Sequence, residues 1–462
     1  MTHHIIIGGG PAATNAAETI RQFDRGESRI TLVSDEPAHS RMALPYWLAG
    51  SIPRAHAHTG DDSYFQTLDV DARIGSRVAS LDAQANSIAL DNGTTLPFDN
   101  LLIATGASPL IPTIPGTDLP GVHPLWSLAH TQSVLDAAAG IERPRVVMVG
   151  AGFVGFIVLN AMFKRGWQLS VVERESQVLP RMLDPRSAEL VERWLASKQV
   201  TVHTQTTVEA IRQGSKDAKI IELAGGETIE ADIVIIATGV KPNIELAAAA
   251  GLATDQGILI DECMQTNVPG IYAGGDAAQG PALFAEGKQV HAIQPTAVDH
   301  GRVAGANMAG HEVRYPGSLL MNVVDVCGLQ CASFGNWNAP EAEPTTIDSP
   351  HGYVYRKLLW TGDQMAGAIF VGRANDMGML TDVGMVKGIL QTQTPLGPWK
   401  DFLCESPFDI RRAYVGAGIA RKLAGATLLG RPTRARRHQF GGVKAVVPEN
   451  PALAVYVETK AS

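Results

Sequence analysis

Two glycine-rich segments supply the clearest chemistry in this chain of 462 residues. The first reads GGGPAA, spans residues 8–13 and directly follows the apolar run HHIII. In a G-x-G-x-x-A loop the first glycine permits a tight turn, the second lets a pyrophosphate approach the backbone, and the last residue lets a helix pack on the strand. The helix N-terminus then receives phosphate charge. The segment therefore predicts a dinucleotide site. Its expected contacts are Gly8, Gly10, Pro11, Ala12 and Ala13.

An acidic partner for the ribose of this first site is expected after the next apolar run, RITLVS. Ser34 occupies the usual strand-end place, and Asp35 and Glu36 follow it directly. A carboxylate at this place accepts hydrogen bonds from ribose hydroxyls. Asp35 and Glu36 are both candidates, and the spacing does not choose between them.

The second segment, GAGFVG at residues 150–155, is a complete fingerprint that follows the run RVVMV. Glu173 ends the next expected strand, 23 residues after Gly150. A carboxylate there binds both ribose hydroxyls and repels a 2′-phosphate, which favours NADH over NADPH. Arg174 comes next and would tolerate that phosphate. The expected contacts in the loop are Gly150, Gly152, Phe153, Val154 and Gly155.

Strand-helix-strand segments position both loops. Buried strands alternate with helical segments in two rounds, which is the rhythm of a parallel sheet. The proline-rich link Pro109–Pro124 separates the rounds and indicates a domain crossing. Two similar units in one chain predict an internal duplication. From about Pro316 the pattern changes to strands with helices, which indicates a separate α+β domain.

The paired loops, two ATG turns and the segment TNVPGIYAGGD at residues 266–276 resemble the FAD/NAD(P)-dependent pyridine nucleotide-disulfide oxidoreductase superfamily. The resemblance covers about residues 1–400. It implies that Asp276 hydrogen-bonds the FAD ribitol. It also implies that a helix entered through residues 294–297 points its N-terminus at the flavin, where its dipole stabilises negative charge on reduced flavin. The further contacts that the resemblance implies are Ala104, Thr105, Gly106, Ala237, Thr238, Gly239, Gly275, Pro295, Thr296 and Ala297.

The resemblance implies an α/β fold with two Rossmann-like dinucleotide-binding domains, for FAD and NAD(H), plus a C-terminal α+β domain. The FAD domain is expected to be discontinuous, with residues 1–115 and 240–315, and the NAD domain to span 116–239. The α+β domain, which resembles a dimerisation domain, is expected at 316–400. Residues 401–462 carry ten Lys and Arg against five Asp and Glu, and are interpreted as a basic extension that docks on a partner.

Met42 is the main departure from the superfamily pattern. In NADH oxidases and coenzyme A-disulfide reductases, the segment that matches SRMALPYWLAG holds a redox cysteine where Met42 stands here. A thioether cannot form a thiolate or exchange with a disulfide. Phe153 matches an aromatic gate that covers the flavin until nicotinamide displaces it, and Arg41 matches an arginine beside the FAD phosphates. Ile157 and Tyr46 are uncharged where relatives carry a glutamate and, in ferredoxin reductases, a lysine.

Composition excludes several function classes. The formal net charge of -8 does not favour nucleic acid or an anionic membrane. Four scattered cysteines do not form a disulfide framework, and Cys327 and Cys331 are expected to be buried strand residues and not metal ligands. No metal site is expected. A strand that begins by Ile5 leaves no room for a targeting peptide, and no apolar run is long enough to span a bilayer, so a cytoplasmic protein is expected.

The resemblance therefore implies hydride transfer from NADH to the flavin, for which nicotinamide C4 and flavin N5 must lie about 3 to 3.5 Å apart. It places the chain with the NADH oxidase, ferredoxin reductase and nitrite reductase-like branch that lacks a redox cysteine. Without a thiol, electrons leave the flavin directly, and an iron-sulfur subunit of a multi-component aldehyde or 2-oxoacid oxidoreductase is the favoured acceptor. The alternative is a free-standing NADH oxidase or a reductase of a small acceptor such as a disulfide or persulfide. Both a homo-oligomer and a hetero-oligomer remain open.

Overall fold

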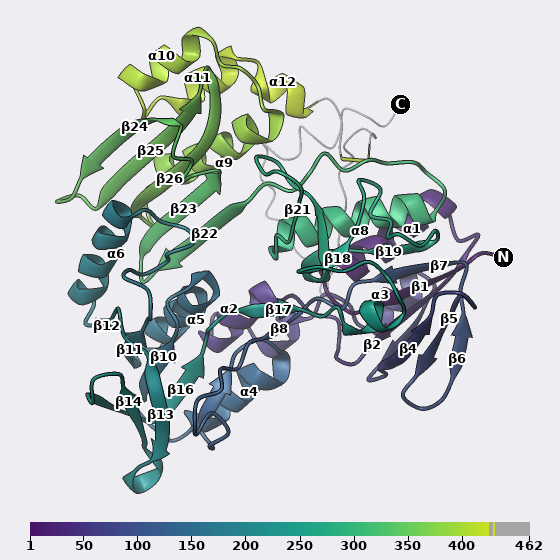
Figure 1. The fold of residues 1–462 in the computed structure, drawn as a ribbon, viewed down its shortest axis with the longest axis horizontal. Helices are drawn as coiled ribbons and strands as arrows, with labels where there is room; N and C mark the ends of the chain where they lie inside the picture. The colour runs from purple at the N-terminus through teal and green to yellow at the C-terminus, as the bar shows by residue number, and fades with distance from the viewer. Residues whose placement is uncertain (425–427, 430–462) are drawn as a thin grey trace, which may run out of the picture.

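The computed structural model describes residues 1–424 and 428–429 (Figure 1). Its first sheet has five parallel strands in the order β19-β7-β1-β2-β3, with the first glycine loop directly after the central strand β1. Strands β1, β2, β7 and β19 are mostly buried and apolar, as is typical of a covered parallel sheet, whereas the edge strand β3 carries Asp71 and Arg73 and is more exposed. The strands are β1 (His3–Ile7), β2 (Arg29–Ser34), β3 (Val70–Ile74), β7 (Asn100–Ile103) and β19 (Ile271–Ala273).

The second sheet repeats this arrangement. Its order is β9-β16-β10-β11-β12, so the strand before the second glycine loop is again central. Each unit also carries a three-stranded antiparallel sheet, β4-β5-β6 in the first and β13-β14-β15 in the second. These repeats agree with an internal duplication. The strands are β9 (Val122–Pro124), β10 (Arg145–Val149), β11 (Gln168–Val172), β12 (Thr201–His203), β16 (Ile233–Ile236), β4 (Val78–Asp82), β5 (Ser87–Leu90), β6 (Thr95–Pro97), β13 (Val208–Gln213), β14 (Lys219–Leu223) and β15 (Thr228–Ala231).

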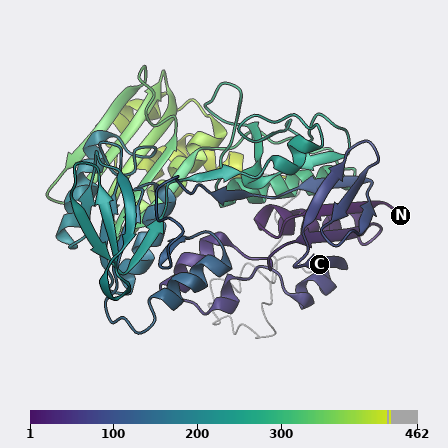
Figure 2. The same cartoon turned by 60° about the horizontal axis from the view of Figure 1, so that its bottom comes forward.

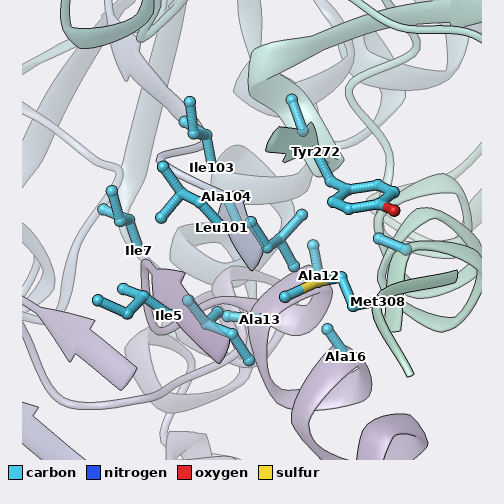
Figure 3. Packing of buried hydrophobic residues seen from close by; sticks show 14 of the residues in the cluster. Ile5, Ile7, Ala12, Ala13, Ala16, Leu101, Ile103, Ala104, Tyr272 and Met308 are labelled. Atoms are coloured by element: carbon cyan, nitrogen blue, oxygen red, sulfur yellow. The ribbon is translucent and has the colours of Figure 1, made fainter. Parts of the chain in front are cut away.

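Two helices distant in sequence, α1 (Pro11–Asp24) and α8 (Gln294–Met308), cross at backbone contact over the first sheet. A Cβ added at Gly301 would lie 2.2 Å from the backbone oxygen of Ala12, and one at Gly305 would lie 2.6 Å from that of Ala16. Figure 3 shows the alanines of α1 between the sheet residues and Met308 of α8. Small residues on both helices therefore let the two backbones touch, and this contact fixes the position of one helix relative to the other.

Two short strands carry the chain between the two units. They are β8 (Ala107–Pro109) and β17 (Val240–Pro242), which pair antiparallel at the centre of the molecule (Figure 1). Asn243 fastens this crossing, because its amide nitrogen donates to the Thr105 carbonyl at 2.9 Å and its own carbonyl accepts from the Thr105 hydroxyl at 2.8 Å. The two units thus meet at a hydrogen-bonded pair of strands.

The C-terminal part of the chain builds an antiparallel sheet in the order β22-β23-β26-β25-β24, covered by α9 (Met377–Thr392). Figure 2 shows this sheet beside the second unit. The two share one hydrophobic core, in which Leu159 of α5 (Phe153–Lys164) and Trp194 of α6 (Pro185–Ser197) lie with Cys331 and Val371. The strands are β22 (Met321–Val326), β23 (Leu329–Gly335), β24 (Glu343–Ser349), β25 (Val354–Thr361) and β26 (Gln364–Arg373).

The expected α/β class, with two Rossmann-like units and a C-terminal α+β part, is confirmed. Cys327 corrects one expectation, because it lies in the turn between β22 and β23 with φ 53° and is not a strand residue. The helices α10 (Pro398–Glu405), α11 (Ile410–Gly416) and α12 (Ile419–Ala424) bury apolar side chains in the same core as α9. The expected boundary at residue 400 therefore does not end that core. Residues 425–427 and 430–462 of the predicted docking arm lie outside the described residues.

No helix among the described residues is long and apolar enough to cross a membrane.

Gly301→Ala tests the helix crossing. We expect a loss of about 1 to 3 kcal/mol in the free energy of unfolding, because the added methyl group overlaps the Ala12 carbonyl and forces α8 away from α1. Thermal unfolding measures the loss. Gly384→Ala in α9 is the control, because its added methyl group meets no atom within 4 Å and should be neutral or stabilising. Equal unfolding temperatures for Gly301→Ala and the unchanged chain would contradict the proposed contact.

Candidate functional site

A cleft of about 1220 Å³ opens beside the first glycine loop and extends to α5 of the second unit. Its size exceeds the 300 to 1,000 Å³ typical of drug-sized ligands. Residues of all three parts of the fold line it. Those predicted from the sequence are Gly8, Gly10, Pro11, Ala12, Asp35, Glu36, Arg41, Met42, Ala104, Thr105, Gly106, Phe153, Val154, Gly275, Asp276, Pro295 and Ala297.

Both glycine loops make the same kind of backbone contact, each with its own ATG turn. Gly8 has φ +119°, and a Cβ there would lie 2.2 Å from the carbonyl oxygen of Ala104. Gly150 has φ +105°, and a Cβ there would lie 2.5 Å from the carbonyl oxygen of Ala237. Each ATG turn therefore lies directly against the first glycine of its loop, and only a residue without a side chain fits at that glycine position.

Three helices begin at the cleft with no side-chain cap. These are α1 after Gly10, α5 after Gly152 and α8 after Ile293, and none has an acidic residue in its first turn. A helix leaves its first N–H groups without intrahelical partners, so a ligand can accept from them. By contrast α4 (Leu128–Ala137), α6 and α9 begin with the caps Ser127, Asp184 and Asp376. The bare helix starts gather where anionic groups would be bound.

Arg41 and Asp276 form an ion pair within the cleft, with 3.3 Å between Nη1 and Oδ2. Arg41 also lies over the indole ring of Trp126, 4.6 Å from its centroid, and Trp126 donates from Nε1 to the Ala107 carbonyl at 2.6 Å. Burial raises the pKa of Asp276 above its ordinary value, and the Arg41 guanidinium opposes the rise. These two charges give the cleft both a hydrogen-bond acceptor and an anion-binding group.

Asp35 and Glu36 both line the cleft at the end of β2. The Asp35 side chain is exposed, and Glu36 is half-buried with its carbonyl accepting from the Ser34 hydroxyl at 2.7 Å. The geometry therefore does not choose between the two carboxylates as the partner of a ribose, and the sequence spacing does not choose between them either. Ala13 and Thr296 are buried and do not line the cleft, and Ala13 packs in the core of the first unit.

Met42 and Phe153 face the same cleft from different units. Met42 lies in a short 3₁₀ helix, η1 (Arg41–Ala43), with 41% of its side chain exposed, and Phe153 is the first residue of α5. Ile157 lines the cleft one turn further along α5, whereas Tyr46 is an exposed residue of α2 (Leu44–Leu48) outside the lining. An apolar wall thus stands where the superfamily pattern places a thiol and charged groups.

Around the second glycine loop the structure places Glu173 as a buried anchor. One carboxylate oxygen accepts from the Ala151 N–H at 2.6 Å and the other from the Glu175 N–H at 2.9 Å. Arg174 is largely exposed and pairs with Glu175 at 3.0 Å. Gly239 has φ +118°, and the Thr238 hydroxyl donates to the Leu110 carbonyl at 2.7 Å. Gly150, Gly152, Gly155, Glu173, Arg174, Ala237, Thr238 and Gly239 do not line the cleft of the first loop.

Trp126 and Asn243 line the cleft although the sequence pattern did not single them out, and Gln294, the first residue of the helix expected to face the flavin, lines it too. Gln294 accepts a hydrogen bond through Oε1 from the Ser40 hydroxyl at 2.9 Å, and so ties α8 to the segment that holds Met42. No glycine motif marks these residues. For Asn243 the sequence offers one signal, which is its position four residues after the second ATG turn.

These features fit the two cofactors that the fingerprints imply. The Gly8 loop, the start of α8 and the Arg41–Asp276 pair offer donors and an acceptor along a cleft large enough for FAD. The Gly150 loop and Glu173 offer a second bare helix start next to a carboxylate, which fits NAD(H). Flavin supplies the hydride chemistry, and the chain's own residues supply binding, orientation and electrostatics.

Comparison with known proteins decides the family. The pyridine nucleotide-disulphide oxidoreductase profile matches residues 2–301. The chain belongs to this family. It is 30% identical over 417 residues to the NADH-dependent phenylglyoxylate dehydrogenase subunit epsilon of Aromatoleum evansii, covering 89% of this chain and 96% of that relative. It is also 34% identical over 340 residues to an NADH oxidase of Methanocaldococcus jannaschii, covering 72% and 75%. A solved NAD-dependent persulfide reductase from A. fulgidus superposes with a TM-score of 0.78 at 29% identity, covering 86% of this chain and 78% of that one.

The chain is therefore an NAD(P)H-dependent FAD oxidoreductase, as the sequence predicted, with FAD and NAD(H) as its cofactors. The roles of individual residues remain predictions. The predicted roles of Glu173 and Asp276 are the most direct to test, because contacts in the structure hold each carboxylate in place.

Glu173→Arg should shift the cofactor preference of this chain from NADH toward NADPH. The change removes a carboxylate that accepts from ribose hydroxyls and supplies a cation for a 2′-phosphate. We expect the ratio of kcat/KM for NADH to that for NADPH to fall by about 10- to 100-fold, the equivalent of one charged hydrogen bond. Arg212→Ala is the control, because this exposed arginine of β13 pairs with Glu222 and does not line the cleft, so the variant should leave NADH kinetics nearly unchanged. An unaltered ratio in Glu173→Arg would refute the assignment.

Asp276→Ala should weaken FAD retention, since it removes the half-buried acceptor and leaves Arg41 without its partner. We expect a loss of about 1.5 to 3 kcal/mol in FAD binding, as for a hydrogen bond to a charged group. The FAD-to-protein ratio after gel filtration measures it. The exposed Asp136→Ala on α4 serves as control. A variant that purifies with full FAD content would count against the contact.

Proposed function

We propose that this chain takes hydride from NADH onto FAD and passes the electrons to an iron-sulfur partner subunit of a multi-component dehydrogenase. FAD binds along the Gly8 loop, and NADH binds at the Gly150 loop in this proposal. The relative from Aromatoleum evansii, which bears the name of a dehydrogenase subunit and covers nearly the whole chain, supports the subunit role.

One observation carries the proposal: none of the four cysteines lines the cleft. Cys327 and Cys331 are buried in the C-terminal sheet and its turn, and burial raises the pKa of both thiols. Met42 stands at the place of the redox cysteine and cannot accept electrons by disulfide exchange. Electrons from the flavin then have no protein thiol to enter. Iron-sulfur centres accept one electron at a time, and FAD converts between two-electron and one-electron transfer.

A free-standing NADH oxidase or small-acceptor reductase is the second candidate. The relative of that name from Methanocaldococcus jannaschii and the partly exposed Met42 at the cleft support it. In this case oxygen or a small acceptor would approach the flavin past Met42, and no partner subunit would be needed.

Rapid kinetics with the purified, FAD-loaded chain separate the two candidates. We expect fast anaerobic reduction of the flavin by NADH, fast turnover with viologen or ferricyanide, and turnover with oxygen or coenzyme A disulfide slower by about 100-fold or more, a barrier difference of about 2.7 kcal/mol. Met42→Cys should not speed NADH-driven flavin reduction, and Met42→Leu is the matched apolar control. Iron-sulfur polypeptides that co-purify with the native protein support the subunit role. Rapid turnover with oxygen or a disulfide supports the second candidate and overturns the first.

A further inference from the structure

The C-terminal part of the chain supplies one wall of the cleft. Met321 and Val323 of β22 line it, and so does Lys387 of α9. Asp299 of α8 lines it as well. Two apolar side chains and two of opposite charge therefore meet the ligand space from a side that the glycine motifs do not describe.

Lys387 and Asp299 differ from the Arg41–Asp276 pair of the same cleft. Arg41 is paired with Asp276, but within the described part of the chain neither Lys387 nor Asp299 makes a hydrogen bond or an ion pair through its charged group. Both side chains are half-buried. Burial raises the pKa of Asp299, and the positive charges of Arg302 and Lys387 oppose that rise. Lys387 thus acts electrostatically on the cleft-facing side of α8.

Position along α8 connects this lysine to the flavin end of the cleft. Pro295 and Asp299 are four residues apart and both line the cleft, so they lie on one face of the helix. Four residues advance a helix by about 6 Å. Lys387 lines the same cleft, so it adds a positive charge to the space that this face of α8 and its free N–H groups also meet. In a half-buried cleft this charge is screened less than on an open surface.

We propose that Lys387 is a positioning residue for charge, which raises the midpoint potential of the bound FAD, and that Asp299 moderates its effect. Hydride transfer from NADH releases NAD⁺ and adds two electrons and one proton to the flavin, which gains one negative charge. A cation beside the start of α8 favours that charged form, whereas a carboxylate disfavours it. The inference rests on the proposed place of FAD along this cleft, but it does not depend on which acceptor takes the electrons.

Redox titration of the FAD-loaded full chain tests the proposal. Lys387→Met keeps the length of the side chain and removes its charge, and we expect a tenfold shift in the equilibrium between NADH and flavin, or about 30 mV lower midpoint potential. Asp299→Asn should raise the potential, and the double variant should lie between the two single variants. Lys387→Arg should keep the potential of the unchanged chain. Lys400→Met is the control, because this lysine of α10 pairs with Glu343 and does not line the cleft.

The outcomes separate this inference from the proposed function. A chain that binds no FAD, or whose flavin NADH does not reduce, overturns the proposed function. Normal FAD content with an unshifted potential in Lys387→Met overturns the role of Lys387 alone. Shifts of the same sign in Lys387→Met and Asp299→Asn would also overturn it, because removing two opposite charges must move the potential in opposite directions. A purely structural role would lower the unfolding temperature without moving the potential.

Discussion

Unsatisfied backbone N–H groups at three helix starts are the constraint on which the arrangement of this protein depends. The helices α4, α6 and α9 close their first turn with Ser or Asp caps, but α1, α5 and α8, which begin at the cleft, have no side-chain cap. Leaving these donors open costs stability unless a ligand accepts from them, since a buried polar group without a partner is expensive. A chain that keeps three such starts around its glycine loops is built to hold anionic ligands. FAD and NAD(H), the cofactors of the family, carry phosphate oxygens that can accept from such N–H groups.

Close backbone packing keeps those starts in place. Gly301 and Gly305 let α8 approach α1, and Gly8 and Gly150 let each loop approach its own ATG turn. Every one of these contacts excludes a side chain, so each fixes a helix start relative to a neighbouring strand or helix. The same solution occurs in both duplicated units, with Ala104 behind the first loop and Ala237 behind the second. The fold thus repeats a backbone device, while the polar residues that differ, such as Asp276 and Glu173, distinguish the two sites.

Much of this could be predicted from the sequence, because glycine spacing and apolar runs report on local backbone geometry. Both loops and both parallel sheets follow from such local signals, whereas the place of Met42 is implied by the resemblance to the superfamily. Contacts between distant segments do not, and Trp126 beneath Arg41 and Lys387 beside α8 are of this kind. Cys327 was assigned to a strand because its surroundings are apolar on both sides, whereas Gly328, with φ +92°, turns the chain there. Basic composition suggested an extension after residue 400, although buried Leu403 and Ile410 tie that segment to the core.

Contacts with both the first and the second unit hold the segment that contains Met42. On one side the Ser40 hydroxyl donates to Gln294 at the start of α8, and on the other Leu48 is buried in the core that the second unit shares with the C-terminal sheet. The Arg165 guanidinium, at the end of α5, donates to the Leu48 carbonyl. Met42 is therefore held between the helix expected to face the flavin and the helix that begins with Phe153. A methionine in this position keeps the wall of the cleft apolar and cannot exchange with a disulfide, which is why the proposed function has the electrons leave from the flavin itself.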